Sequence, residues 1–414
     1  MRRYFEAYAG LPKSIYVIFF ASIINYMGNF VGPLLTMILT YEAGLDVGIV
    51  GIITAINAGA GMLGTLLGGK LIDQIGRKRV LVIFRTLAGI GFGLCAFTSS
   101  SVMMVGLLMV ARFFGGFSGP VYDTMIADLT EGEQRKTSYS LNYMAINVGY
   151  AIGPLLAGFL YKHYLTWLFL GDAMTTFLSV VLVMSLVPET MPTKDIIEKS
   201  HERGDEKIEQ GNLFQALLKR PMLCAFSLIV AIYFMIFNQV FFAVPIKLGE
   251  LFAEDGAIIF GSLITINAVM CSVFTAFVNA ATSKLKPALA MSYGGIFYGV
   301  GFGILIWADN YTMFVISTVI WTIGEILISI NTSVYIADHT PISHRGRFNS
   351  VFPLIRRLGA MIGPIVGGLI LKGAGQVVLW AIIGLFGIIA ALCMLLLYRL
   401  EVKRTCTSEE NLVQ

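Results

Sequence analysis

Apolar runs of roughly twenty residues recur along the whole chain, and they restrict it to a membrane-embedded fold. Of the 414 residues, 57% are hydrophobic and 13% are charged, whereas soluble domains carry about 25% charged residues. Backbone groups inside lipid must be hydrogen-bonded within the chain, so each run predicts a helix. The sequence therefore predicts an all-α membrane protein with twelve transmembrane helices, near residues 14–40, 46–70, 79–98, 101–125, 138–161, 167–187, 222–246, 256–281, 287–308, 311–336, 348–371 and 376–398.

Lysine and arginine are distributed unevenly over the loops, and this asymmetry predicts the orientation. With the amino terminus inside, the cytoplasmic segments carry 22 of these residues and the outer loops carry 3, namely Lys162, Lys247 and Lys372. We therefore expect a multi-pass protein of the cell (inner or plasma) membrane with both termini in the cytoplasm. The net charge of +4 is spread over short loops and indicates no nucleic-acid partner.

A charged stretch at residues 191–220 separates six predicted helices from six, and the two sets repeat. At a constant offset of 210 residues, Asp128 aligns with Asp338, Gly153-Pro154 with Gly363-Pro364, and Asn57 with Asn267. Such a repeat predicts two six-helix bundles related by a pseudo-two-fold axis along the membrane normal, with a site between them near the midplane. The expected boundaries are a first bundle at 1–190, a cytoplasmic linker at 191–220, a second bundle at 221–400 and a cytoplasmic tail at 401–414.

The loop between the second and third predicted helices is short and charged, from Gly69 to Arg79. Three consecutive cations at its end cannot lie against lipid, which places the loop at a membrane surface. Gly69 and Gly76 are expected to let two helices enter and leave a tight turn. A generic basic loop, with surface ion pairs worth about 0–1 kcal/mol, is the plainer interpretation.

This loop resembles the signature loop of the major facilitator superfamily, Gly-x-Leu-x-Asp-Arg-x-Gly-Arg-Lys/Arg. It matches at Gly69, Leu71, Asp73, Gly76, Arg77 and Lys78, and it departs at Gln74. The resemblance implies that Gly69, Asp73, Gly76, Arg77 and Lys78 form a conformational latch with Asp128, whose repeat mate is Asp338. Protonation of an acid would loosen this latch and permit the two bundles to rock.

Two further stretches resemble motifs of one branch of that family. The first runs from Arg112 to Gly116 and is similar to an intramembrane motif of proton-coupled members. The second runs from Gly149 to Gly158 and is similar to a motif of drug-exporting antiporters, with Ala157 in place of a glycine. Small residues let helices pack closely and proline bends them, so we expect helix bending at Gly149, Gly153, Pro154, Gly158, Gly363 and Pro364.

Charged residues inside predicted spans are costly and therefore point to function. Glu325 lies near the centre of the tenth span, where a carboxyl group is suited to load and release a proton and to attract cations. Arg112 in the fourth span is either a structural cation or one that tunes a neighbouring acid. We assign proton coupling to Glu325, Arg112, Asp123 and Asp128.

The resemblance implies a substrate cavity lined by spans 1, 4, 7 and 10, with additions from spans 5 and 11. Aromatic side chains suit bulky apolar ligands, and an acid suits cations. Any one of these aromatics is equally compatible with packing between helices or against lipid. The predicted cavity residues are Asn25, Tyr26, Asn29, Tyr122, Tyr143, Asn147, Phe234, Phe237, Asn238, Phe241, Trp321, Glu325 and Arg356.

Together these features imply a bacterial-type drug:proton antiporter that exports amphiphilic or cationic small molecules by alternating access. The expected partners are a small-molecule substrate, protons and membrane lipids, and the chain is expected to act as a monomer. No enzyme motif, cofactor-binding motif or metal-ligand spacing is evident, and the five cysteines show no pattern. A lipid or glycolipid flippase, a metabolite or sugar transporter, and a non-transporting sensor or scaffold remain alternatives.

Overall fold

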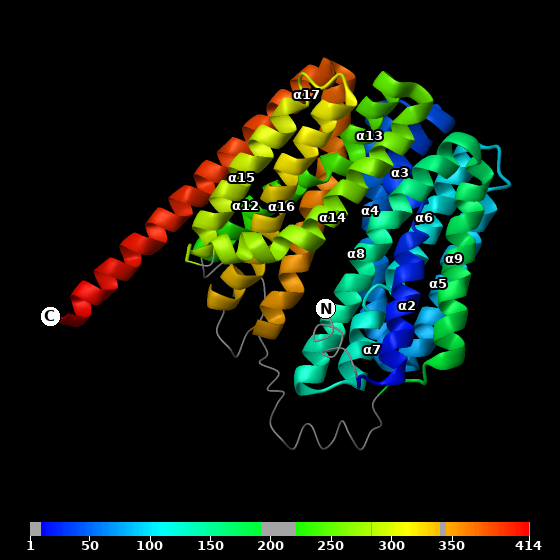
Figure 1. The fold of residues 1–414 in the computed structure, drawn as a ribbon, viewed down its shortest axis with the longest axis horizontal. Coiled ribbons are helices and arrows are strands. Elements are labelled where there is room, and N and C mark those ends of the chain that lie inside the picture. The colour runs from blue at the N-terminus through cyan, green and yellow to red at the C-terminus, as the bar shows by residue number, and fades with distance from the viewer. Residues whose placement is uncertain (1–9, 192–220, 283, 340–344, 414) are drawn as a thin grey trace. The chain divides into compact units, whose positions relative to one another are not determined.

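The computed structural model describes residues 10–191, 221–282, 284–339 and 345–413, and the regular elements in these ranges are helices (Figure 1). Contacts divide the chain into two compact units. Unit 1 comprises Met1–Gly44, Ile56–Gln210 and Phe252–Ala268, and unit 2 comprises Leu45–Ala55, Gly211–Leu251 and Val269–Gln414. Two short segments are thus exchanged relative to the predicted bundles, and the predicted linker lies almost entirely outside the described residues.

The first half of the chain forms α2 (Lys13–Met27), α3 (Val31–Met37), the π-helix η1 (Ile38–Glu42), α4 (Val47–Ile75), α5 (Arg77–Cys95), α6 (Ser101–Phe117), α7 (Val121–Leu129), α8 (Gly132–His163) and α9 (Leu165–Leu186). The second half forms α12 (Pro221–Phe237), α13 (Gln239–Phe252), the 3₁₀ turn η2 (Ala253–Asp255), α14 (Gly256–Thr282), α15 (Pro287–Ile304), α16 (Tyr311–His339) and α17 (Arg345–Val413).

The predicted spans are all occupied by helix. In the described parts of the chain, eight segments are long and apolar enough to cross a membrane. Two of them, Pro221–Thr282 with 62 residues and Arg356–Lys403 with 48 residues, exceed the roughly 20 residues of one crossing and each hold two predicted spans. Helices α5 and α15, with 19 and 18 residues, occupy the third and ninth positions. The positive φ of Gly375, +79°, marks the join between the last two spans.

Three predicted spans are interrupted, and two of the interruptions follow the sequence repeat. In the first span the helix is broken between α2 and α3, at residues 28–30. In the seventh span it is broken between α12 and α13, at Asn238. Gly28 and Asn238 are 210 positions apart. The fourth span is interrupted between α6 and α7 at residues 118–120.

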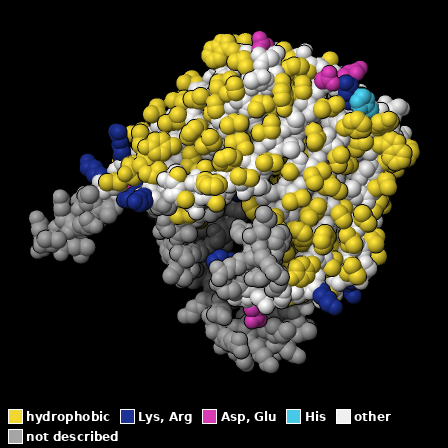
Figure 2. Space-filling view, in the orientation of Figure 1, with side chains coloured by type: hydrophobic (Ala, Val, Ile, Leu, Met, Phe, Trp, Pro, Cys, Tyr) yellow, Lys and Arg dark blue, Asp and Glu magenta, His cyan; other side chains and the backbone are white. Residues whose placement is uncertain are grey.

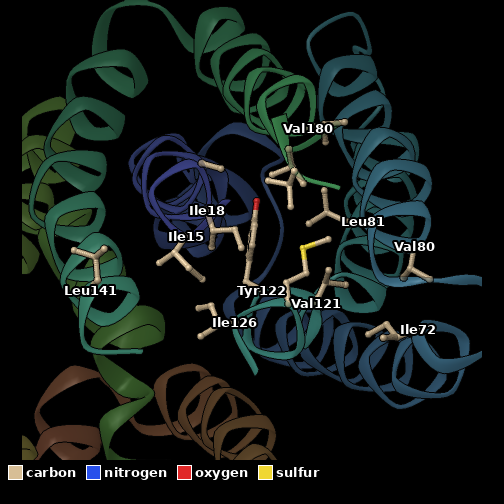
Figure 3. Close-up of a cluster of buried hydrophobic side chains, with 14 of the residues drawn as sticks. Ile15, Ile18, Ile72, Val80, Leu81, Val121, Tyr122, Ile126, Leu141 and Val180 are labelled. Atoms are coloured by element: carbon tan, nitrogen blue, oxygen red, sulfur yellow. The ribbon is translucent and has the colours of Figure 1, made fainter. Parts of the chain in front are cut away.

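Each unit has its own packing. In unit 1, α2 packs on α8 and α9, and α5 packs on α6 and α9; in unit 2, α15 packs on α16 and α17, and α12 packs on α17. Hydrophobic side chains cover most of the visible helical surface, and charged side chains lie near helix ends (Figure 2). Figure 3 shows the core of unit 1, which includes Ile15, Ile18, Leu81, Val121, Tyr122, Ile126 and Val180.

Candidate functional site

Arg77 is the first residue of α5, and its side chain is buried against two acids. Its Nε donates a hydrogen bond to Oδ2 of Asp128 at 2.9 Å, and its Nη1 donates to the carbonyl oxygen of Ile72 at 3.1 Å. The same Nη1 lies 3.3 Å from Oδ1 of Asp73, a carboxylate that is 72% exposed, whereas the Asp128 side chain is 14% exposed. The structure therefore brings Arg77 together with both predicted partners, while the latch role remains a prediction.

Glu189 is a member of this cluster that sequence reasoning missed. Its Oε1 accepts the backbone N–H groups of Arg77 at 2.8 Å and of Lys78 at 3.4 Å. Gly76, the N-cap of α5, has no side chain to accept these bonds, so Glu189 supplies the anionic cap that a helix amino terminus favours. Next to it, the Thr190 hydroxyl donates to Oδ2 of Asp128 at 3.2 Å. The sequence did hold a signal for this contact. Glu189 directly follows the sixth predicted span, at the membrane surface that was also predicted to carry the basic loop.

The two glycines of the loop have different places. Gly76 has φ of +104°, and a Cβ there would lie 2.5 Å from Oε2 of Glu189. Gly69 lies inside α4, and a Cβ there would have nothing within 4 Å. The prediction that Gly69 begins the turn is wrong, because α4 continues to Ile75 and the positive φ of Gly76 alone turns the chain.

Gly76→Ala is expected to destabilise the protein, because alanine is strained at this φ and displaces the Glu189 carboxylate. Backbone strain of this kind costs about 1–3 kcal/mol, which thermal unfolding in detergent will show as a lower Tm. Gly69→Ala is the matched control, and alanine in an open helical position is expected to be neutral or to stabilise by about 0.5–1 kcal/mol. Equal Tm values for the two variants would contradict the assignment of the turn to Gly76.

Two cations of unit 1 deserve comparison because they lie well inside spans, namely Arg85 in α5 and Arg112 in α6. The Arg112 side chain lies over Gly61 of α4, where an added Cβ would be 3.1 Å from its Nε. The Nε of Arg85 is buried and has no hydrogen-bond partner among the described residues. The fields of Arg85, Arg112 and Asp123 all reach Tyr26. Arg85 thus interacts electrostatically with Tyr26, as the predicted residues Arg112 and Asp123 do, although sequence reasoning gave Arg85 no role.

Unit 2 holds the predicted coupling acid beside a thiol. Glu325 in α16 is half-buried, and the Cys271 thiol of α14 donates to its Oε2 at 3.7 Å. The Arg356 guanidinium of α17 lies 4.2 Å from the centre of the Phe234 ring, a distance suited to a cation–π interaction.

Predicted aromatic residues of spans 7 and 10 contact one another within unit 2. The Phe237 ring centre lies 6.0 Å from those of both Phe241 and Trp321. The buried Trp321 ring also stacks on Phe302, with ring centres 6.0 Å apart. In the break, the Asn238 amide donates to the carbonyl oxygen of Phe234 at 2.9 Å. These residues form the aromatic part of the candidate site.

The predicted cavity residues of unit 1 are more dispersed. Asn25 is buried in α2, and Tyr26 packs on Tyr150 with ring centres 5.3 Å apart. On α8, Tyr143 is exposed and Asn147 is half-buried, and the Asn147 amide donates to the Tyr143 carbonyl oxygen at 2.8 Å.

Tyr122 does not have the place predicted for it. It is 7% exposed and lies in the hydrophobic cluster of unit 1, between α2, α5 and α9 (Figure 3). The break before α7 turns this residue into the core, so Tyr122 contributes packing there.

The glycines of the α8 motif pack against the broken first span. A Cβ on Gly149 would lie 2.5 Å from Cβ of Tyr26, and one on Gly153 would lie 2.7 Å from the carbonyl oxygen of Met27. In α17, Gly363 makes the equivalent contact, because its carbonyl oxygen accepts from Nε2 of Gln239 at 2.8 Å beside the break of span 7. Both helices continue through Pro154 and Pro364, so the expected bends remain a prediction.

Two close backbone contacts are related by the 210-residue repeat, and Gly51, which makes one of them, lies at the opposite end of α4 from Gly76. In the α8–α14 contact, a Cβ on Gly261 would lie 2.3 Å from the Pro154 carbonyl oxygen. In the α4–α17 contact, a Cβ on Gly51 would lie 2.3 Å from the Pro364 carbonyl oxygen. Glycine is required at both positions because backbone atoms cannot give way as side chains do.

An ion pair accompanies each of these contacts. Lys162 Nζ lies 2.7 Å from Oδ1 of Asp255, and Lys372 Nζ lies 3.0 Å from Oδ1 of Asp46. The two lysines are 210 positions apart and the two acids 209, and each pair joins residues from opposite halves of the sequence.

The Asp46–Lys372 pair is insensitive to pH near neutrality. Its hydrogen bond with Lys372 lowers the pKa of Asp46 below the ordinary value. Because the pKa of Asp46 is lowered, its ionised form stabilises the contact at every pH above the ordinary pKa of an aspartate. This stabilisation is lost only when the pH falls through the lowered pKa. The Asp46 carboxylate therefore stays ionised at neutral pH.

Lys247 is not the outer-loop residue that was predicted. It is 6% exposed inside α13, its ammonium group donates to the carbonyl oxygen of Leu305, and it lies 6.0 Å from the centre of the Phe314 ring. The reason is that α13 continues to Phe252, beyond the predicted end of the seventh span.

The side chain of Asp338, which was predicted as part of the latch, lies outside those that the structure describes.

Comparison with known proteins gives a consistent family. A model of the Major Facilitator Superfamily matches residues 18–296 and 255–410. A Na⁺, Li⁺, K⁺/H⁺ antiporter from Planococcus maritimus is 24% identical over 398 residues, which cover 90% of this chain and 92% of that protein. Quinolone resistance protein NorA from Staphylococcus aureus is 27% identical over 187 residues, 42% of this chain and 46% of that protein.

Solved structures show the same fold. A peptide transporter POT in complex with sulfate gives a TM-score of 0.76 at 17% identity, covering 94% of this chain and 95% of the other. The nucleoside transporter NupG gives 0.74 at 14% identity, covering 94% and 99%.

Proposed function

Because the chain belongs to the Major Facilitator Superfamily, whose members here are transporters and not enzymes, we propose that it is a proton-coupled antiporter. Its substrates are amphiphilic or cationic small molecules, which it exports by alternating access. The observation that carries this proposal is Glu325, a half-buried carboxyl group in the middle of α16 and four residues from the aromatic cluster at Trp321. An acid beside aromatic rings suits both a proton and a bulky cation.

Alternating access is supported by the charged contacts at the two ends of the helices. Arg77 bridges Asp73 and Asp128 beside the Gly76 turn, and the α8–α14 and α4–α17 contacts carry ion pairs at the opposite ends. In the proposed cycle, the α8–α14 and α4–α17 contacts open and close, and protonation of an acid in the Arg77 cluster loosens that cluster. The Gly76 end is cytoplasmic, the membrane is the cell membrane, and a monomer with its surrounding lipids suffices.

A second candidate is exchange of a monovalent metal cation for protons, which is favoured by the similarity to the Na⁺, Li⁺, K⁺/H⁺ antiporter of Planococcus maritimus. The two candidates share the proton but differ in the second substrate. Flippase, sugar transport and non-transporting roles have no comparable observation in their favour.

Proteoliposomes with an imposed pH gradient test the proposal. One pH unit supplies about 1.4 kcal/mol per proton, enough for roughly a tenfold gradient of a substrate exchanged one for one without net charge. We expect a cationic dye to move against its gradient when the pH gradient is imposed and to stop when a protonophore dissipates it. Movement of Na⁺, Li⁺ or K⁺ without dye movement would favour the second candidate, and no movement of either would contradict proton-coupled antiport.

A further inference from the structure

The break in the first span leaves backbone groups without helical partners. Helix α2 ends at Met27 and α3 begins at Val31. Between them, the N–H groups of Gly28, Asn29 and Phe30 donate to nearby backbone carbonyl oxygens, and an N–H group without any acceptor would be costly in this environment. Asp172 of α9 adds a side-chain acceptor where α3 begins: its Oδ2 accepts the N–H group of Val31 and shares that of Phe30 with the Gly28 carbonyl oxygen, at 3.1 Å from each nitrogen. Asp172 is 4% exposed, so the acceptor comes from a neighbouring helix and not from water.

The break is also held sterically from two sides. On the α9 side, a Cβ on Gly28 would lie 1.8 Å from Oγ1 of Thr175, and one on Gly171 would lie 2.8 Å from the Phe30 ring. On the α8 side, Gly149 and Gly153 contact the last turn of α2. The peptide units of residues 28–30 are therefore fixed between α8 and α9, with the Asp172 carboxylate as the hydrogen-bond acceptor.

The second half of the chain provides an internal comparison. Its equivalent break, at Asn238, is one residue wide, and the N–H groups of Phe241 and Phe242 both donate to the Asn238 carbonyl oxygen at 3.1 Å. Local backbone bonds form at both breaks, but the position equivalent to Asp172 is the apolar Ile382. The carboxylate thus accompanies the wider break only, as expected if its purpose is to hold that break.

We propose that Asp172 is a positioning residue for substrate binding, acting through the break on Tyr26 and Asn29. Tyr26 stands in the last turn before the break, packed on Tyr150, and Asn29 stands within it. Capping Phe30 and Val31 fixes the direction in which both side chains leave the backbone. This inference rests on the proposed function, because Tyr26 and Asn29 are predicted substrate contacts.

Two roles of the Asp172 carboxylate can be separated by substitution, namely accepting hydrogen bonds and carrying a charge. Asp172 interacts electrostatically with two cations, Arg85 of α5 and Arg112 of α6. It also interacts with the titratable thiol of Cys95 in α5. Asparagine keeps an acceptor oxygen in the same place and is a good helix cap, but it removes the charge. Alanine removes both.

The experiment compares Asp172→Asn with Asp172→Ala in the full-length protein. Ser227→Ala is the control, since this buried hydroxyl in α12 donates to the Leu223 carbonyl oxygen of its own helix. We expect Asp172→Ala to raise the KM for a cationic dye about tenfold, or 1.4 kcal/mol, with kcat within about twofold, and to speed hydrogen exchange of amides 28–31. Asp172→Asn and Ser227→Ala are expected to match the wild type in KM, in exchange and in the pH profile.

A double-mutant cycle with Tyr26→Ala tests the route of action. If Asp172 acts through Tyr26, Asp172→Ala adds much less to KM in the Tyr26→Ala background than it does alone. Fully additive effects, a shifted pH profile for Asp172→Asn, or unchanged exchange in Asp172→Ala would each overturn the proposal. Should the alanine variant not accumulate, the asparagine variant decides alone. A wild type that does not transport the dye contradicts the proposed function, while the exchange data still report on Asp172.

Discussion

Replacing Glu325 by glutamine is expected to reduce transport driven by a pH gradient to the level of empty vesicles. Glutamine has nearly the same shape, and its amide oxygen can accept from the Cys271 thiol as the carboxylate does, but it cannot gain or lose a proton. A charge at a helix centre costs roughly 2.5–3.5 kcal/mol on insertion scales, so an acid there is expected to serve function. Exchange of labelled for unlabelled substrate, which needs no net proton movement, should persist.

The measurement is dye accumulation in proteoliposomes with and without a pH gradient, followed by substrate exchange in the same preparation. Glu254→Gln is the matched control, because this acid lies exposed in the η2 turn and neutralising it should leave both rates unchanged. Gradient-driven transport at the wild-type rate in Glu325→Gln would mean that the proton is carried elsewhere. Loss of both gradient-driven transport and exchange would assign Glu325 to substrate binding instead of coupling.

Helix positions were predictable from the sequence because lipid imposes one strong requirement, an apolar run of sufficient length. Helix ends were less predictable, because a helix can leave the apolar region and continue in water. Helix α4 therefore runs past Gly69 through Lys70 and Asp73 to Ile75, and α13 carries Lys247 inside rather than in a loop. Hydropathy also does not register a break such as residues 28–30, where local hydrogen bonding changes but apolar content does not.

Pairings were predictable only where the family pattern supplied them. The Arg77–Asp128 contact followed from the signature loop, whereas Glu189, 112 positions from Arg77, needed the fold to bring it there. Asp172 was passed over because one acid in an apolar run does not identify its acceptor role. Lys162 and Lys372 were counted only as loop cations, although their 210-residue separation already related them; their partners Asp255 and Asp46 depend on how segments from opposite halves pack.

The repeat leads to the second large expected effect, at Gly51 and Gly261. A Cβ at either position would lie 2.3 Å from a proline carbonyl oxygen, about 1 Å closer than van der Waals contact permits. The close approach of α4 to α17 and of α14 to α8 would then be lost. We expect Gly51→Val and Gly261→Val each to abolish dye transport while the protein still accumulates in the membrane, and the alanine variants to retain an intermediate rate.

Two matched controls separate this effect from a general intolerance of glycine replacement. Gly106 and Gly303 also lie in helices, and a Cβ on either would have nothing within 4 Å, so their valine variants should transport at near the wild-type rate. Gly51 and Gly261 are equivalent in the repeat. If both contacts must close in every cycle, each valine variant should lose transport even though the other contact is intact. Accessibility of an introduced Ala257→Cys thiol to an impermeant maleimide, in a background without the native cysteines, should rise in Gly261→Val. Wild-type transport in either valine variant would show that the close approach is dispensable, and the contacts would then be packing features outside the transport cycle.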